Sequence, residues 1–378
     1  METPVYQYNL NLLEETLASA QTEANRYNYI LHYAVKANNN HTILETIAKR
    51  GFGADCVSGN EIAAAINAGF PPQSIVFAGV GKTESEIEFA IDKGIACIHV
   101  ESIEELQQIN KISARLEKTA TIALRLNPNL DAGTHQHITT GTNRNKFGLS
   151  NRELIQVVDS LPSLQWVKVI GFHFHIGSQI LDLKRFVQLA HHANGIVKQY
   201  GHLDISYLNL GGGLGIDYEN PNDNPIPSFA EYFLTFYRNL RVPRNISIHF
   251  EPGRSLVGQC GNLLTRVLYV KQGDERKFAI VDAGMNNLIR PALYQAKHKI
   301  EVVNSHSLTF DMYDVVGPIC ESSDTFATSI ELPSLKQGDI IAIRSAGAYG
   351  ESMSSNYNLR QYTPCVFINQ KKLVLAAN

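Results

Sequence analysis

The sequence predicts a (β/α)8 TIM barrel followed by a mostly antiparallel β domain. Between about residues 27 and 254, short apolar, β-branched runs alternate with segments of helical periodicity. After about Val257 the runs become shorter and alternate in polarity between Gly, Asp and Ser turns, which is typical of antiparallel sheets. The chain has 378 residues, 44% of them hydrophobic, so it can form one large domain and one smaller domain.

Eight strand candidates, separated by helical segments, define the predicted barrel. They are Tyr29–Ala37, Gly53–Ser58, Ser74–Val80, Ala96–Glu101, Thr121–Pro128, Val169–Gly177, Tyr207–Gly212 and Ser247–Glu251. Capping sequences at Ser58 and Thr83 mark helix starts between them. We therefore place the barrel at residues 20–256 and the β domain at residues 257–378, joined by residues 1–19, in which Val5–Tyr8 resembles a strand.

Composition and charge exclude several classes of function. Lys and Arg total 33 against 36 Asp and Glu, and the charges are scattered, which argues against nucleic acid as a partner. No stretch approaches the length of a membrane span, and the N-terminus lacks a basic, apolar export signal. The 5 cysteines are widely spaced and include no Cys-x-x-Cys, so neither a disulfide framework nor a zinc ribbon is expected. We expect a cytoplasmic protein.

A lysine stands at the end of the first predicted barrel strand, where TIM barrels carry their catalytic groups. Lys36 lies in the apolar run Tyr33-Ala-Val-Lys-Ala-Asn38. Desolvation lowers the pKa of a buried lysine, and a neutral amine can form a Schiff base. A surface lysine whose stem packs on apolar neighbours is the alternative interpretation.

Two histidines end the sixth predicted strand. His173 and His175 alternate with Phe172 and Phe174, so both imidazoles are expected to point into the barrel mouth. A metal pair is one interpretation, although no Asp and His cluster at the other strand ends completes a metal site. The following Gly177-Ser178 turn can offer an amide and a hydroxyl to an anion.

The last two predicted strands end in a glycine run and a carboxylate. Gly211 to Gly213 are either a flexible turn or a phosphate cradle of successive amides, and barrel phosphate sites often use this position. Glu251 either pairs locally with Arg254 or faces a pyridine nitrogen, which a carboxylate keeps protonated.

A cysteine beside a carboxylate marks the β domain. Cys320 and Glu321 lie in Gly317-Pro-Ile-Cys-Glu-Ser-Ser323, a segment too rich in Gly and Pro for a helix core. Taken alone, Cys320 would be a buried structural cysteine, because free cysteines are usually buried.

Together these motifs resemble the fold-type III pyridoxal phosphate (PLP) enzymes, the alanine racemase-like barrel group, over nearly the whole chain. Three C-terminal segments narrow the resemblance to the diaminopimelate decarboxylase family: Asp282-Ala-Gly-Met-Asn-Asn-Leu-Ile-Arg-Pro-Ala-Leu-Tyr294, the Cys320 segment and Ala346-Gly-Ala-Tyr-Gly350. Several motifs in the same order make this resemblance specific.

The resemblance implies a role for each matching residue. Lys36 would form the Schiff base with PLP and His175 would stack on its ring. The phosphate would be held by Ser178, Gly211, Gly212, Gly213 and Tyr349. Glu251 would bind the pyridine nitrogen, and Asp55 and Arg125 would line the same mouth. The substrate would be bound by Arg254, Arg290, Tyr294, Glu321 and Tyr349, with Cys320 as the proton donor.

The implied reaction is the decarboxylation of meso-2,6-diaminopimelate to L-lysine, the last step of lysine biosynthesis. The distal end of this substrate carries one negative and one positive charge, which arginines and a carboxylate would recognise. The resemblance also implies a homodimer in which Cys320 and Glu321 reach the site of the second subunit.

Four alternatives have distinguishing features. Alanine racemase would be expected to place an arginine at the pyridine nitrogen instead of Glu251. A decarboxylase of another basic amino acid or polyamine precursor, such as ornithine or arginine, would have no role for Arg290. A non-catalytic PLP-binding protein would need no β domain, and a metal hydrolase would be built on His173 and His175.

Overall fold

The computed structural model describes residues 2–130, 145–305 and 307–369, and these divide into two compact units. We call residues 17–215 and 228–253 the barrel unit, and residues 1–16, 216–227 and 254–378 the β unit. Helix α1 (Leu10–Asn25) crosses the boundary between the two units. Among the described residues, no helix has the length and apolar character needed to cross a membrane.

The barrel unit contains a closed eight-stranded parallel barrel, which confirms the predicted fold class. Its strands are β2 (Ile30–Ala34), β3 (Gly53–Cys56), β4 (Ile75–Phe77), β5 (Cys97–Val100), β6 (Ala120–Arg125), β7 (Val167–His173), β8 (Tyr207–Asn209) and β9 (Ser247–Phe250). The barrel closes where β2 pairs with β9, in the register Ile30 to His249 and Leu31 to Phe250.

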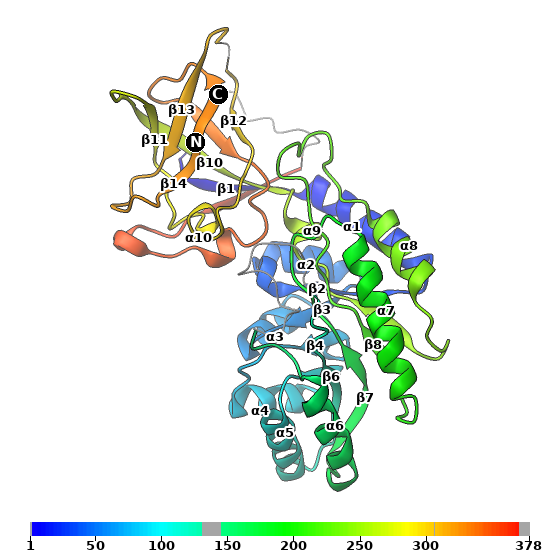
Figure 1. Ribbon diagram of the computed structural model, residues 1–378. Helices are drawn as coiled ribbons and strands as arrows, with labels where there is room; N and C mark the ends of the chain where they lie inside the picture. Colours follow the sequence, from blue (N-terminus) through cyan, green and yellow to red (C-terminus); the bar gives the residue numbers. More distant parts are fainter. Residues whose placement is uncertain (1, 131–144, 306, 370–378) are drawn as a thin grey trace. The chain divides into compact units, whose positions relative to one another are not determined.

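Helices alternate with these strands along the chain (Figure 1). They are α2 (His41–Lys49), α3 (Gly59–Asn67), α4 (Glu84–Lys93), α5 (Ile103–Leu116), α6 (Asn151–Ser160), α7 (Lys184–Gln199) and α8 (Phe229–Asn239). The predicted capping residues are confirmed: Ser58 accepts a hydrogen bond from the amide of Glu61, and Thr83 forms a capping box with Glu86.

Strand alternation decides which side chains face the barrel interior. Phe250 packs on the aromatic rings of Phe233 and Phe236 in α8, with ring centroids 5.2 and 5.0 Å away. Because successive side chains of a strand point to opposite faces, His249 and Glu251 point the other way, into the barrel. The same alternation turns His99 of β5, His173 of β7 and Asn209 of β8 inward, and all three are buried.

The β unit contains a mostly antiparallel sheet, as predicted. Its strands are β1 (Val5–Asn9), β10 (Gly261–Gln272), β11 (Lys277–Val281), β12 (Ile300–Val302), β13 (Phe310–Val316), β14 (Thr325–Pro333), β15 (Ile340–Ile343) and β16 (Cys365–Ile368). The sheet order is β12-β15-β10-β11-β13-β14, with β1 paired to β10 and β16. The N-terminal strand therefore joins this sheet, as its sequence indicated. Two short helices, α9 (Arg254–Val257) and α10 (Arg290–Tyr294), carry the predicted substrate arginines.

Candidate active site

Lys36 lies beyond the end of β2, in a 3-10 turn formed by Val35–Ala37. Its Nζ atom donates a hydrogen bond to Oδ2 of Asp55 at 2.8 Å. The apolar run around Lys36 predicted a desolvated amine. The structure corrects this prediction, because the Lys36 side chain is 35% exposed and has a carboxylate partner. Burial raises the pKa of Asp55 to about 6, and Lys36 opposes that rise.

His175 and Ser178 follow β7 in a loop, whereas the sequence predicted that the strand continues to Gly177. β7 ends at His173 because its partner β8 ends at Asn209, where the glycine run begins. Burial lowers the pKa of His175 well below its ordinary value, and its Nδ1 accepts a 3.3 Å hydrogen bond from the amide of Gly212. The expectation that His173 and His175 share a strand face is therefore wrong.

The glycine run packs tightly against its neighbours. Gly211 and Gly213 have φ angles of +68° and +105°, in the left-handed region that favours glycine. A Cβ atom on Gly212 would lie 2.2 Å from the backbone oxygen of Glu251. Glycine is required here because the backbones are in direct contact, and the run can present its amides as an anion cradle.

Glu251 follows β9 and is buried in the barrel, where it contacts groups from three other strands. Its Oε2 lies 3.1 Å from Nε2 of His173, and its Oε1 accepts a 2.7 Å hydrogen bond from Nδ2 of Asn209. Burial raises the pKa of Glu251, while Lys36 acts in the opposite direction. The structure does not pair His173 with His175: Nε2 of His173 lies next to Glu251 and its ring stacks on His99, and the ligand atoms of His99, His173 and Glu251 lie within 4.8 Å of one another.

Arg125 ends β6 and is buried, in an ion pair that sequence reasoning missed. Its Nη1 lies 2.7 Å from Oε1 of Glu101, and its guanidinium lies 4.8 Å from the ring centre of Phe147. Glu101 also accepts hydrogen bonds from the amides of Gly79 and Gly148. Arg125 thus anchors the carboxylate that holds two loops beyond the strands of the barrel.

The two predicted substrate arginines of the β unit are buried side by side around one tyrosine. Arg254 donates from Nη1 to the hydroxyl of Tyr218 at 2.7 Å, and the guanidinium of Arg290 lies 4.8 Å from the centre of the same ring. Arg254 also lies 4.8 Å from the ring centre of Tyr349. The sequence did not single out Tyr218, which lies in an irregular segment with no motif.

Arg290 has a second polar neighbour. Its Nη1 donates to Nε2 of His298 at 2.7 Å, and Nδ1 of His298 lies 2.8 Å from the backbone oxygen of Arg344. His298 is neutral because burial lowers its pKa to about 3. The Nε atom of Arg290 has no hydrogen-bond partner among the described residues. Tyr294 ends the same short helix and is partly buried.

Cys320 and Glu321 form an exposed pair in the β unit. Exposure of Cys320 overturns the interpretation of a buried structural cysteine. Oε1 of Glu321 accepts a 2.7 Å hydrogen bond from the hydroxyl of Tyr357, a residue that the sequence did not indicate. Buried Asp324 stabilises the loop, because its carboxylate accepts hydrogen bonds from the amides of Ile319 and Met285 at 2.6 Å each.

The barrel residues fit a cofactor that carries a phosphate and a ring nitrogen. They supply an amine at Lys36, a glycine cradle, and a buried carboxylate at Glu251. Oδ1 of Asp55 is buried without a hydrogen-bond partner among the described residues. One buried hydrogen-bond acceptor at this end of the barrel can therefore still bind a ligand.

Comparison with known proteins assigns the class. The model of the family described as "Pyridoxal-dependent decarboxylase, pyridoxal binding domain" matches residues 10–258. The chain belongs to this family of pyridoxal-dependent decarboxylases, so its cofactor is pyridoxal 5'-phosphate and the protein is a carboxy-lyase.

Several similar proteins are diaminopimelate decarboxylases. The chain is 50% identical over 364 residues to that of Bacteroides thetaiotaomicron, covering 96% of this chain and 94% of the relative. It is 41% identical over 383 residues to that of Neisseria meningitidis serogroup B, covering 98% and 90%. The crystal structure of diaminopimelate decarboxylase from Helicobacter pylori complexed with L-lysine matches with a TM-score of 0.92 and 40% identity, over 97% of this chain and 92% of that one.

Proposed function

We propose that this protein decarboxylates meso-2,6-diaminopimelate to L-lysine and CO2, the last step of lysine biosynthesis. The names of its relatives support this activity. The structural observation that supports this choice of substrate is the pair of buried guanidinium groups on Arg254 and Arg290. Nε of Arg290 has no hydrogen-bond partner among the described residues, and two guanidinium groups around one tyrosine favour an anion, so a carboxylate fits this cluster.

The barrel residues hold the cofactor in this proposal. Lys36 supplies the covalent attachment, His175 stacks on the ring, and Glu251 pairs with the pyridine nitrogen. The phosphate is bound by Ser178, Gly211, Gly212, Gly213 and Tyr349, and Asp55 keeps the Lys36 amine in place. When bound, PLP withdraws the electron pair that remains after the substrate carboxylate leaves as CO2.

The substrate residues lie in the β unit. Arg254, Arg290 and Tyr294 bind the distal carboxylate, and Tyr349 contributes a hydroxyl to the substrate as well as to the phosphate. Glu321 binds the distal ammonium group, because a carboxylate is the natural partner of a cation. Cys320 returns a proton to the carbon that has lost CO2. Tyr357 orients Glu321 through its hydrogen bond.

We further propose a homodimer in which Cys320 and Glu321 serve the active site of the partner subunit. The exposure of both side chains supports this arrangement, because a residue with a chemical role is otherwise left in solvent. The five free cysteines support a cytoplasmic location, where thiols stay reduced.

A decarboxylase of another basic amino acid is the alternative. The chain has the fold of lysine/ornithine decarboxylase from Vibrio vulnificus, with a TM-score of 0.84 at 18% identity over 97% of this chain and 94% of that one. That likeness concerns the fold alone, and ornithine has no distal carboxylate for Arg254 and Arg290 to bind.

The deciding experiment is a substrate panel on the PLP-loaded enzyme. CO2 release is measured with meso-diaminopimelate, L-lysine, L-ornithine and L-arginine. We expect release from meso-diaminopimelate alone, and we expect Lys36→Ala to lose both this activity and the visible absorption band of the bound cofactor. Release from ornithine but not from meso-diaminopimelate would overturn the proposed substrate.

A further inference from the structure

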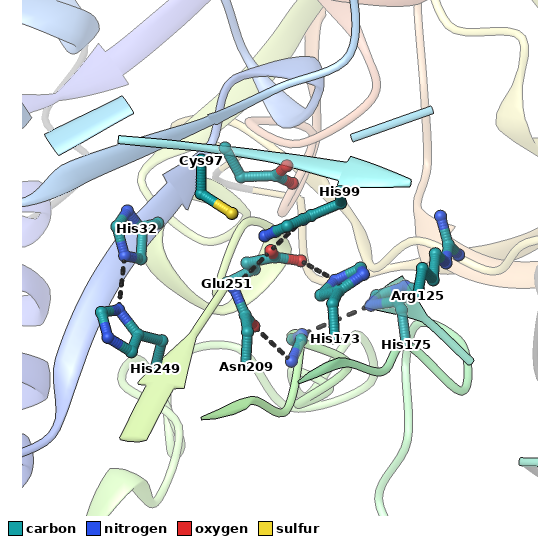
Figure 2. A network of polar contacts seen from close by, with 12 residues as sticks. His32, Cys97, His99, Arg125, His173, His175, Asn209, His249 and Glu251 are labelled. Atoms are coloured by element: carbon teal, nitrogen blue, oxygen red, sulfur yellow. Dashed lines mark hydrogen bonds and ion pairs between the residues drawn. The ribbon is translucent and has the colours of Figure 1, made fainter. Parts of the chain in front are cut away.

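The carboxylate of Glu251 lies in a buried polar network inside the barrel (Figure 2). Groups from β5, β7 and β8 converge on it: His99, His173 and Asn209. In the closed barrel β5 and β9 are not neighbours, so His99 and Glu251 meet across the interior. The proposed role of Glu251 needs an ionised carboxylate, yet burial raises its pKa.

The orientation of the Asn209 amide follows from its backbone neighbour. The amide N–H of Gly211 donates to Asn209 at 2.9 Å, so the acceptor there must be the carbonyl oxygen Oδ1. The Nδ2 group then carries both donors. One goes to Oε1 of Glu251 at 2.7 Å, and the other goes to the hydroxyl oxygen of Tyr207 at 2.8 Å.

The position of the proton on His99 follows in turn. Since Tyr207 accepts from Asn209, its own hydroxyl hydrogen is available for Nε2 of His99, 2.9 Å away. His99 is neutral, because burial lowers its pKa well below the ordinary value. Its single N–H therefore stands on Nδ1, the atom that faces Oε1 of Glu251 at 3.6 Å.

His173 supplies the donor for the other carboxylate oxygen. Burial also lowers its pKa, so its ring is neutral, and a proton on Nε2 makes a 3.1 Å hydrogen bond to Oε2 of Glu251. The two imidazoles stack with centroids 4.0 Å apart and planes 15° apart, which restrains both rings. Asn209 and His173 thus donate hydrogen bonds to Glu251, while the Nδ1–H of His99 faces Oε1 from 3.6 Å, beyond hydrogen-bond distance, and acts on the carboxylate through its dipole.

We propose that His99 is a positioning residue of the active site, which acts through Glu251. Its Nδ1–H, fixed by Tyr207 and Asn209, favours the ionised carboxylate and holds it in the orientation that receives the protonated ring nitrogen of the cofactor. This inference rests on the proposed function, in which Glu251 binds that nitrogen. His99 does not touch the substrate in this role.

Other charged or titratable groups also act on Glu251. They are Lys36 and His32 from the β2 segment, Asp55 from β3, Cys97 from β5, Arg125 from β6, His173 from β7, Tyr207 from β8 and Tyr232 from α8. These groups are common to the two His99 variants compared below, so a difference between those two variants reports on His99 itself.

Two amide substitutions separate the two nitrogens of His99. His99→Asn places an N–H near the former Nδ1 and loses the bond to Tyr207. His99→Gln reaches the Tyr207 hydroxyl but loses the N–H that faces Glu251. Both variants are neutral and polar. The first readout is the pH at which Glu251 becomes protonated in the PLP-free enzyme. Infrared spectroscopy measures this pH from the carboxylate band of Glu251. The band is assigned by its absence in Glu251→Gln.

We expect His99→Gln to raise that pH by about one unit, a factor of about ten in proton affinity, and His99→Asn to leave it near the wild-type value. Tyr207→Phe should shift it in the same direction as His99→Gln, because the hydroxyl that fixes the His99 tautomer is gone. An unchanged protonation pH in His99→Gln, or equal shifts in the two amide variants, would overturn the proposal.

The second readout is PLP affinity together with the kcat of the PLP-loaded enzyme. We expect His99→Gln to weaken PLP binding and to lower kcat about tenfold, with His99→Asn largely retaining both. If either variant fails to fold, Tyr207→Phe still tests the hydrogen-bond network around His99, since it removes one hydroxyl and keeps the ring. The infrared measurement needs neither PLP nor substrate, so failure of the substrate panel is distinguishable from failure of this inference.

Discussion

Nη1 of Arg254 lies 2.7 Å from the hydroxyl of Tyr218, whose ring also faces the guanidinium of Arg290. One tyrosine therefore orients both arginines that we propose for the distal carboxylate of the substrate. Removing the hydroxyl takes away one of the contacts that orient Arg254, while the ring remains beneath Arg290.

We expect Tyr218→Phe to raise KM for meso-diaminopimelate by a factor of about ten, the range of one hydrogen bond to a charged group, with kcat little changed. Initial rates over a range of substrate concentrations give both constants. Tyr269→Phe, at an exposed position of β10, is the matched control. A loss of kcat at constant KM would place Tyr218 in the chemical step instead.

Gly212 and Gly195 make a second matched pair. A Cβ atom on Gly212 would lie 2.2 Å from a backbone oxygen, which cannot move aside without displacing Glu251. Gly195 lies inside α7 and has no atom within 4 Å of the same added carbon. We expect Gly212→Ala to weaken PLP binding at least tenfold and to lower Tm, because the cradle and Glu251 move together.

Gly195→Ala should instead raise the stability by about 0.5–1 kcal/mol, because alanine loses less backbone entropy than glycine on entering a helix. Thermal unfolding and PLP titration measure both variants. Equal PLP affinity in Gly212→Ala and wild type would show that the glycine run tolerates a side chain and that its tight packing has no role in cofactor binding.

Sequence reasoning predicted the barrel and several site residues because each of these features has a local signal. The strands alternate with helices, and Lys36 and Glu251 stand just beyond strand ends, where barrels place functional groups. His175 could be named from its motif, but its position in a loop could not. β7 ends early since its partner strand gives way to glycines with left-handed φ angles.

The site residues that sequence reasoning did not predict make contacts between distant segments. Tyr218 and Arg254 are 36 positions apart, Arg125 and Glu101 are 24 apart, and no motif links either pair. His99 lies in a predicted strand, so alternation could place it on one face. That it meets Glu251 depends on the closed barrel, which brings β5 and β9 to a common interior.

The buried histidines of the barrel predict how stability depends on pH. Burial lowers the pKa values of six histidines of the barrel unit, His32, His99, His173, His175, His192 and His249, in the last case to about 2. The unfolded chain binds a proton at each of these sites below about pH 6.5, whereas the folded barrel does not. Their contribution to stability is therefore present above that pH and is lost as the pH falls.

Four carboxyl groups of the barrel unit act in the opposite direction. Burial raises the pKa of Asp55 to about 6 and that of Glu61 to about 7, and it also raises the pKa values of Glu105 and Glu251. Their contribution is present at low pH and is lost as the pH rises through these raised pKa values. Between pH 6.5 and 5 the histidines outnumber them. We expect the unfolding free energy of the PLP-free protein to fall by roughly 2–3 kcal/mol per pH unit at the acid end of this range.

Urea unfolding at a series of pH values measures this slope. His249→Gln should reduce the slope by about one proton, or 1.4 kcal/mol per pH unit, because a neutral amide takes up no proton on unfolding. His202→Gln provides a control at an exposed histidine. A stability that rises as the pH falls from 6.5 to 5 would mean that the carboxyl groups outweigh the histidines.

The proposed sharing of the active site between subunits predicts complementation between two inactive variants. Lys36→Ala removes the cofactor attachment and Cys320→Ala removes the proposed proton donor. In a mixed dimer one site then carries both substitutions, and the other carries neither if Cys320 acts across the interface. Random exchange of equal amounts should therefore restore about a quarter of the wild-type activity.

The measurement is CO2 release after subunit exchange, with each variant assayed alone as the baseline. Native mass spectrometry shows whether mixed dimers have formed. If Cys320 acts within its own subunit, both sites of a mixed dimer are defective and no activity returns despite exchange. Ser323→Ala, beside the same loop and exposed, should remain active by itself and so controls for general disturbance of the segment that carries Cys320 and Glu321.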